Sequence, residues 1–163
     1  MPLSLHLLIH FSLAVLSGYF VGHWYKNVKL GVVLGIIGGF LIDLDHVFEY
    51  FLFYGLNFNL TYFLEGREFL LSDKIHLFLH AWEYIVLFSF LIIIFRKRKL
   101  IKFILITLLF AGTVHLITDC FINNYPPKNY SLIYRAKQNF LMPKILSSEQ
   151  YQNNIEERKK LGI

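Results

Sequence analysis

Charged residues and cysteine are scarce in this sequence. Only 17% of the 163 residues are charged, whereas 56% are hydrophobic and 18% aromatic. The mean hydropathy is +0.51. An average soluble domain carries roughly 25% charged residues. A composition this apolar excludes an ordinary soluble domain, and the length allows a single domain that we place in a membrane.

The single cysteine, Cys120, excludes an intrachain disulfide and a thiolate metal cluster. Its neighbour is Asp119, so a soft metal ligand is one interpretation. We favour a buried packing thiol, the usual role of a free cysteine. The first apolar run has neither a basic leading segment nor a small-residue cleavage pattern, so we interpret it as a membrane span and not as a signal peptide.

Four apolar runs are each near the ~20 residues that cross a bilayer as a helix. They cover Leu3–Val21, Leu30–Tyr54, Ile75–Phe95 and Leu100–Ile122. The predicted fold class is therefore all-α: a polytopic membrane protein with a bundle of about four transmembrane helices. We expect a membrane domain over 1–124 and a basic polar tail over 125–163.

Two polar segments lie outside these runs. Residues 57–74 contain several charges and are expected to form a polar loop. In the tail, Ser147 and Gln150 have the spacing of a capping box, which predicts a short surface helix over Ser148–Leu161.

Histidine and carboxylate residues interrupt every apolar run. A charged group in the bilayer core costs roughly 2.5–3.5 kcal/mol on insertion scales, so such residues usually have a function. The residues are His6, His10, Asp43, Asp45, His46, Glu49, His76, His80, Glu83, His115 and Asp119. Histidine and carboxylate are the ligands of a divalent metal such as zinc, manganese or ferrous iron.

Alternating span direction brings these residues to one level of the membrane. They lie early in the first and third runs and late in the second and fourth runs. All therefore fall in the same half of the bilayer, whereas His23 falls at the opposite end and is excluded from the site.

Spacing orients the side chains within each run. His6 and His10 are four residues apart, as are His115 and Asp119, and residues at this interval share a helix face. In the third run, His76 and His80 are also four residues apart, and Glu83 follows three residues later. On a helix these three side chains would form one stripe.

On the second run, Asp43 and His46 share a face, but Asp45 points roughly 160° away from Asp43 on an ideal helix. Either the helix is distorted after Gly38-Gly39, or one aspartate orients a ligand without binding the metal itself.

These motifs resemble those of the small bacterial and archaeal membrane-bound metal-dependent hydrolases, the YdjM-like group and its relatives. The resemblance covers about Leu7 to Phe121. It is carried by a histidine early in the first run (His10 more than His6), by Asp43-x-Asp45-His46, by His76 with His80, and by His115-x-x-x-Asp119. The histidine pair departs from the family pattern His-Arg-Gly-x-x-His. The resemblance implies metal-dependent hydrolysis and names no substrate.

We therefore expect a membrane-embedded metallohydrolase. The predicted metal ligands are His10, Asp43, Asp45, His46, His76, His80, His115 and Asp119. Asp43, His76 and Glu83 are also the candidates for a general base or other catalytic role. The candidate groups exceed what one tetrahedral zinc uses, so we expect one or two divalent ions, with zinc first and manganese or iron as alternatives.

The expected partners are the lipid bilayer and a lipid or lipid-linked substrate, with a phosphoester favoured over an amide because a headgroup bond lies at this level. Nucleic acid is not expected, because the basic block is short and lies beside hydrocarbon. A divalent-metal transporter or sensor, or a structural protein clipped by metal, is the alternative. The oligomeric state is open, a homo-oligomer included.

Basic residues near the span ends predict sidedness in an inner membrane. Seven lie on one side: Lys26, Lys29, Arg96, Lys97, Arg98, Lys99 and Lys102. Five lie on the other: Arg67, Lys74, Lys128, Arg135 and Lys137. The loops with seven are also the shorter ones, so the positive-inside rule places them in the cytoplasm and the metal site on the outer side.

Overall fold

The computed structural model describes residues 3–163, with side chains from Leu5 onward. It is all-helical, with 76% of residues in helices and no strand among the described residues. The chain divides into two compact units. Unit 1 comprises Met1–Ile42 and Ala81–Pro127, and unit 2 comprises Asp43–His80 and Lys128–Ile163.

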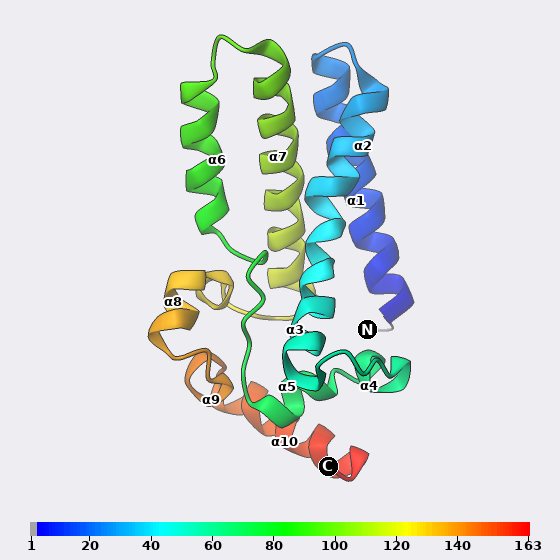
Figure 1. Cartoon of the computed structure of the whole chain (residues 1–163), viewed down its shortest axis with the longest axis vertical. Helices are drawn as coiled ribbons and strands as arrows, with labels where there is room; N and C mark the ends of the chain where they lie inside the picture. Colours follow the sequence, from blue (N-terminus) through cyan, green and yellow to red (C-terminus); the bar gives the residue numbers. More distant parts are fainter. Residues whose placement is uncertain (1–2) are drawn as a thin grey trace. The chain divides into compact units, whose positions relative to one another are not determined.

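Unit 1 contains four apolar helices, drawn side by side in Figure 1: α1 (Leu3–Trp24), α2 (Val28–Gly39), α6 (Glu83–Ile94) and α7 (Lys99–Ile122). α1 and α2 form one hairpin, whose turn contains Lys26 at a φ of 58°. Asn27 ends that turn, and its side chain accepts a hydrogen bond from the Leu30 amide at 3.2 Å. This cap explains why α2 begins at Val28.

Glycine allows α1 and α2 to pack at backbone contact. A Cβ added to Gly35 would lie 2.4 Å from the Ala14 carbonyl oxygen and 2.6 Å from Gly18 Cα. A Cβ on Gly31 would lie 2.4 Å from the Gly18 carbonyl oxygen. Small residues allow this close approach between helices in lipid, where apolar burial alone does not drive association.

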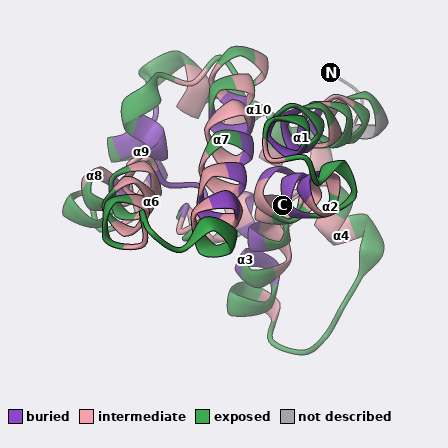
Figure 2. Ribbon diagram, turned by 90° about the horizontal axis from the view of Figure 1, so that it is seen from above, coloured by how far each residue is buried: buried purple, intermediate pink, exposed green. Residues whose placement is uncertain are grey.

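The buried residues of α7 form a stripe along one face. Every fourth residue from Phe103 is buried, and the series is Phe103, Thr107, Ala111, His115 and Asp119. Figure 2 shows the buried and exposed parts of α7 alternating around the helix. Near its start, Phe103 forms a small core with Val21 of α1 and Leu34 of α2. The same stripe therefore directs His115 and Asp119 into the interior of unit 1.

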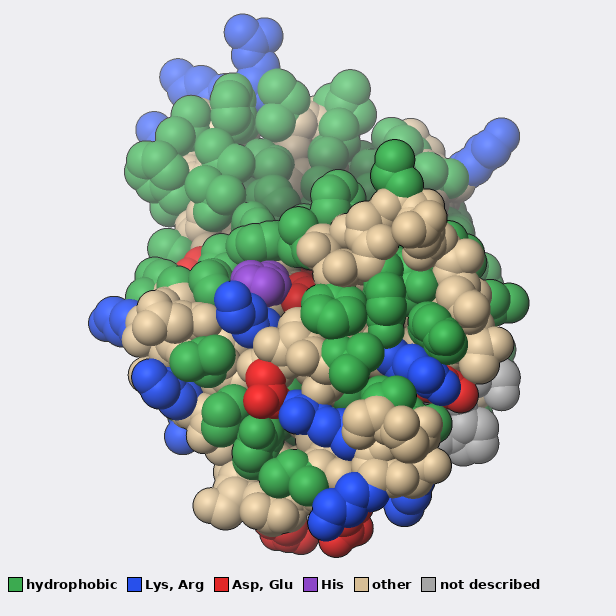
Figure 3. All heavy atoms as spheres, turned by 60° about the horizontal axis from the view of Figure 1, so that its bottom comes forward, with side chains coloured by type: hydrophobic (Ala, Val, Ile, Leu, Met, Phe, Trp, Pro, Cys, Tyr) green, Lys and Arg blue, Asp and Glu red, His purple; other side chains and the backbone are tan. Residues whose placement is uncertain are grey.

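Within the described part of the chain, three helical segments are long and apolar enough to cross a membrane: Leu5–Trp24, Val28–Tyr54 and Lys99–Ile122. In the space-filling view, hydrophobic side chains cover the upper part, and Lys and Arg project at its far end (Figure 3). These features indicate a membrane protein. The second segment is not one straight helix, because α2 ends at Gly39 and a 3₁₀ turn at Leu41–Asp43 precedes α3. The predicted distortion after Gly38-Gly39 is thus confirmed.

The predicted helix over Ile75–Phe95 is wrong in its first part. Residues 75–82 include no regular helix, and α6 covers only Glu83–Ile94, which is shorter than a membrane span. The reason is a set of long-range hydrogen bonds. Carboxylates of Asp45 and Glu49 accept from the amides of His76, Leu77, Leu79 and His80. An intact helix from Ile75 would commit the amides from Leu79 onward to its own carbonyls.

Unit 2 is built from short helices: α3 (Leu44–Tyr54), α4 (Leu60–Leu64), α5 (Arg67–Ser72), α8 (Leu132–Lys137), α9 (Met142–Ile145) and α10 (Ser148–Leu161). A 3₁₀ turn, η2, spans Pro127–Tyr130. Residues 57–74, expected as a loop, thus contain two helices. The predicted helix Ser148–Leu161 is confirmed at both ends, with the Ser147–Gln150 capping box formed. The division at residue 124 stays a prediction.

Candidate metal centre

In unit 1, three histidines surround Asp119. His10 Nε2 and His115 Nε2 each lie 3.2 Å from an oxygen of Asp119, and His6 Nε2 lies 3.9 Å away. The His10 ring is 4.1 Å from that of His115 and 4.4 Å from that of His6, centroid to centroid. We name these four residues the first cluster. Ligand atoms of His6, His10 and Asp119 lie within 4.8 Å of one another, as binding of a single ion requires.

Two features of the first cluster suit a metal. His115 Nδ1 lies 2.7 Å from the Gly39 carbonyl oxygen, which can only accept a hydrogen bond, so Nδ1 donates one through its N–H. His115 therefore carries its proton on Nδ1 and presents the Nε2 lone pair toward Asp119. His10 is 1% exposed, and neither ring nitrogen has a hydrogen-bond partner. Apart from the 3.2 Å contact of Nε2 with Asp119, nothing satisfies this buried imidazole, which is costly, and a metal ion would satisfy it.

In unit 2, Asp43, His46 and His80 form the second cluster. One ligand atom from each lies within 4.8 Å of the others. His80 Nε2 is 3.5 Å from Asp43 Oδ1, and the His46 and His80 rings are 5.3 Å apart. Its donors are two imidazoles and a carboxylate, one imidazole fewer than in the first cluster. Three protein ligands of this kind, two histidines and a carboxylate, are found in catalytic zinc sites.

Asp45 and Arg135 both bind the backbone at His80, and Asp45 also contacts its ring. Asp45 Oδ2 accepts from the Leu79 amide at 2.6 Å and lies 3.3 Å from His80 Nδ1. The Arg135 guanidinium is 1% exposed and donates to the carbonyls of Leu77 at 2.9 Å and His80 at 2.7 Å. The Asp45 contact directs Nε2 of His80 toward Asp43, an arrangement common around metal-binding histidines.

His76 is not brought into the second cluster, although it was a predicted ligand. Its Nδ1 lies 2.8 Å from Glu49 Oε1, and its side chain is 24% exposed. Glu49 is 4% exposed and also accepts from the amides of His76 and Leu77. His76 and Glu49 therefore form a separate pair at the edge of unit 2.

Glu83 is the first residue of α6 in unit 1, so the predicted helical stripe His76–His80–Glu83 is wrong. His23, as expected, lies apart from the first cluster: it is exposed near the end of α1 and stacks with Tyr19 at 6.1 Å. Cys120 is half-buried and belongs to neither cluster.

Sequence reasoning missed Arg135 and underrated His6 and Glu49. Arg135 lay in a segment interpreted only as a basic tail, and nothing local marks it as buried. The four-residue spacing from His6 to His10 was the signal for His6. Glu49 was visible as a carboxylate inside an apolar run, which is a functional indicator by default.

Glu68 on α5 is a further buried carboxylate of unit 2. Burial raises the pKa of its carboxyl to about 7, and the charge of Glu49 adds to the shift. Glu68 is 1% exposed, and its Oε2 has no hydrogen-bond partner. Neutral Glu68 is thus substantially populated at physiological pH.

Over residues 3–163 the chain is therefore all-helical, with three segments able to span a membrane and the two clusters of histidine and aspartate named above. Comparison with known protein families, with curated proteins and with solved structures gives no match.

Proposed function

We propose that the chain is a membrane-embedded metal-dependent hydrolase that acts on a lipid or lipid-linked substrate. One observation carries the proposal: His10 is almost fully buried, with both ring nitrogens lacking a hydrogen bond, beside Asp119 and two further imidazoles. Packing alone gives no reason to bury such a group, whereas a divalent ion does.

Each cluster has the donors for one divalent ion. His6, His10 and Asp119 would hold an ion in unit 1, with His115 beside Asp119, and Asp43, His46 and His80 would hold one in unit 2. Nitrogen and carboxylate donors without a thiolate suit zinc, manganese or ferrous iron. The geometry favours Asp43 as the ligand and Asp45 as the residue that orients His80, because the carboxylate of Asp45 is engaged by Leu79 and His80.

A divalent ion supplies Lewis-acid polarisation of the scissile group and activates water near neutral pH. The chain's own residues would orient the reactants and move protons. His76 is our candidate general base: Glu49 fixes the proton on Nδ1, and the partly exposed side chain leaves Nε2 reachable. Glu49 thus orients the base, as a third group does in many catalytic arrangements.

The proposed substrate class follows from the membrane environment of the candidate metal-binding residues. Apolar helices that suit a bilayer carry the metal-binding residues, so the accessible bonds belong to lipids. We favour a phosphoester, because its developing charge is the kind that divalent ions stabilise. We also propose α6 as a fourth, short membrane helix, since it packs against α7 within unit 1.

The test combines metal analysis with hydrolysis. Protein purified in mild detergent without chelator should contain a stoichiometric divalent ion by elemental analysis. It should release phosphate or headgroup from phospholipid vesicles, and chelation should abolish the release. His10→Ala and the bulkier His10→Gln should lose metal and activity. His23→Ala is the matched control, and it should keep both.

Metal-loaded protein that moves zinc into sealed vesicles and hydrolyses neither phosphoester nor amide lipids would support the transporter alternative. Protein that neither contains metal nor takes up zinc or manganese on titration would refute the metal centre itself.

A further inference from the structure

An uncharged, aromatic segment follows the buried acidic residues of α3. From Tyr50 to Leu64 no residue is charged, and seven of the 15 are aromatic. The segment includes the end of α3, a turn at Gly55 with a φ of 64°, and α4. We name residues 50–64 the aromatic hairpin. Neither metal cluster involves it, and its composition is unlike that of a loop in water.

The aromatic hairpin is held in shape from within. Tyr50 is fully buried, with the rings of Tyr54, Phe58 and Phe63 at 4.8, 5.4 and 5.8 Å. The Tyr50 hydroxyl accepts from the Asn59 amide at 2.9 Å. Asn59 in turn caps α4 by accepting from the Tyr62 amide. The turn is thus fixed to α3 by aromatic contacts around the buried Tyr50 ring.

Several large apolar side chains of the aromatic hairpin are nevertheless exposed, including that of Phe58, which also touches Tyr50. Leu56 is 95% exposed, and Leu52 and Leu60 are each 59% exposed. Phe58 and Leu64 are exposed by 53% and 54%. A contiguous apolar patch on a soluble surface marks an interaction site. We therefore expect the exposed side chains of the aromatic hairpin to contact an apolar partner.

Arg67 marks where the patch ends. Its guanidinium lies over the Tyr62 ring at 4.3 Å and pairs with Glu65 at 2.5 Å. Aromatic rings next to basic groups are typical of the membrane–water boundary. The charged residues therefore resume directly beyond Leu64, as they would where a chain leaves a lipid surface.

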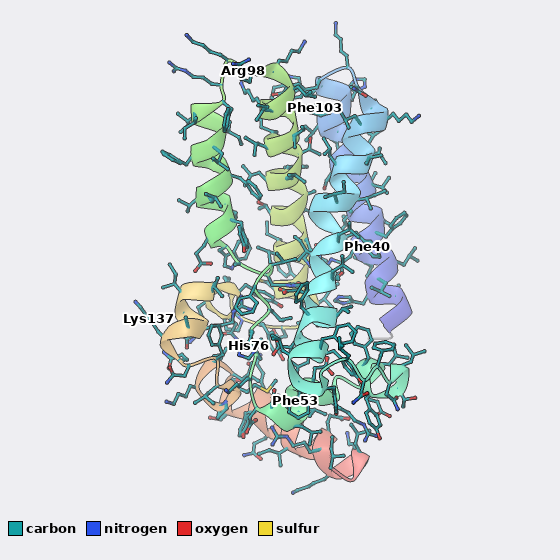
Figure 4. All side chains as sticks on the ribbon, viewed as in Figure 1. Phe40, Phe53, His76, Arg98, Phe103 and Lys137 are labelled. Carbon is teal, nitrogen blue, oxygen red and sulfur yellow. The ribbon has the colours of Figure 1, made fainter. Side chains whose placement is uncertain are left out.

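We propose that the aromatic hairpin lies in the membrane interface, with its exposed apolar side chains against lipid acyl chains. α3 forms the last part of the apolar segment Val28–Tyr54, whose 27 residues exceed the ~20 needed to cross hydrocarbon, so the end of this segment has length to spare for the headgroup region. The hairpin continues the apolar surface of α3, where Phe53 is labelled in Figure 4. Continuity with a membrane helix identifies lipid as the occupant.

Site-directed spin labelling tests this with the full chain. Leu56→Cys, Leu60→Cys and Asn153→Cys are made singly in a Cys120→Ser background, labelled and reconstituted into phosphatidylcholine–phosphatidylglycerol vesicles. Asn153 is the matched control, because it is exposed on the polar helix α10 of the same unit. Collision rates with apolar oxygen and with a water-soluble nickel chelate are then compared.

Labels at 56 and 60 should favour oxygen several-fold over the nickel chelate, and the label at 153 should favour the chelate. Chelate-favoured collisions at 56 and 60 would place the hairpin in water and overturn the proposal. So would shielding from both reagents with spin–spin broadening, which would show a second copy of the chain on this surface. The result is independent of metal content and of hydrolysis.

Discussion

At the residue scale, the role of Arg135 follows from its two hydrogen bonds to the backbone beside His80. Arg135→Met removes both hydrogen bonds, to the half-buried Leu77 carbonyl and to the buried His80 carbonyl, and the second loss alone costs about 1–3 kcal/mol. We expect the metal affinity of the second cluster to fall by roughly ten- to a hundredfold, as for other residues that support metal ligands. Zinc titration by calorimetry measures it.

The matched control is Arg158→Met, which removes the same charge from α10, where Arg158 pairs with Asp73 of unit 2. It should lower thermal stability and leave zinc affinity unchanged. Equal loss of affinity in both variants would mean that Arg135 acts only through the stability of unit 2.

A second residue-scale prediction concerns Glu68 and pH. Burial raises its pKa from 4.5 to about 7 in the folded protein. Between these values the folded state keeps a proton that the unfolded chain has released, so the free energy of unfolding falls as pH rises and levels off above about 7. The loss from this group is at most on the order of 3 kcal/mol.

Glu68→Gln cannot lose that proton. Thermal unfolding between about pH 5 and 8 should therefore show a smaller decline for Glu68→Gln than for the unmodified chain. Glu149→Gln, an exposed acid on α10, should decline like the unmodified chain. Parallel declines for all three proteins would show that Glu68 ionises freely.

At the scale of elements, the contact between α1 and α2 is the most sensitive packing in unit 1. Gly35→Ala would place a Cβ 2.4 Å from a backbone oxygen, so the two helices must separate. We expect a loss of about 1–3 kcal/mol, typical of overpacking. Thermal unfolding in detergent measures it.

Gly112→Ala on α7 is the control, because its nearest contact, the Gly38 oxygen, would lie at 3.2 Å. The Gly38 backbone must shift by only a few tenths of an ångström, and the gain in helix propensity offsets this, so Gly112→Ala should lose much less stability than Gly35→Ala. If Gly35→Ala is as stable as Gly112→Ala, the helices are not in backbone contact.

Elements with local signals were predictable from sequence. The capping box fixed both the presence and the start of the helix at Ser148, and apolar length located α1 and α7 to within a few residues. The segment before Glu83 was not predictable, because its amides bind carboxylates of Asp45 and Glu49, far away in sequence. Apolarity alone cannot distinguish such a segment from a helix.

The same distinction between local and long-range signals separates the site residues that were predicted correctly from those that were not. The four-residue interval correctly paired His6 with His10 and His115 with Asp119, because those residues lie on regular helices. The same rule failed for His76 and His80, which lie on irregular backbone. The different contacts of Asp43 and Asp45 depend on a 3₁₀ turn that spacing suggested only as one of two alternatives.

At the scale of the whole molecule, sidedness decides where the chemistry occurs. The turns between α1 and α2 and between α6 and α7 lie at the same end of unit 1 (Figure 1), and both carry exposed basic residues. Arg98 is labelled at this end in Figure 4. Short basic loops stay in the cytoplasm. The first cluster, at the other end of α1 and α7, would then lie on the outer side.

Single cysteines on either side of α7 test this prediction. Lys97 precedes α7 and Asn123 follows it, and both side chains are exposed. In a Cys120→Ser background, Asn123→Cys should react with an impermeant thiol reagent in intact cells. Lys97→Cys should react only after the membrane is permeabilised, because its loop is on the cytoplasmic side. The reverse pattern would invert the topology and place the first cluster, with any hydrolysis it supports, on the cytoplasmic side. Reaction of both positions in intact cells would show that α7 does not cross the membrane.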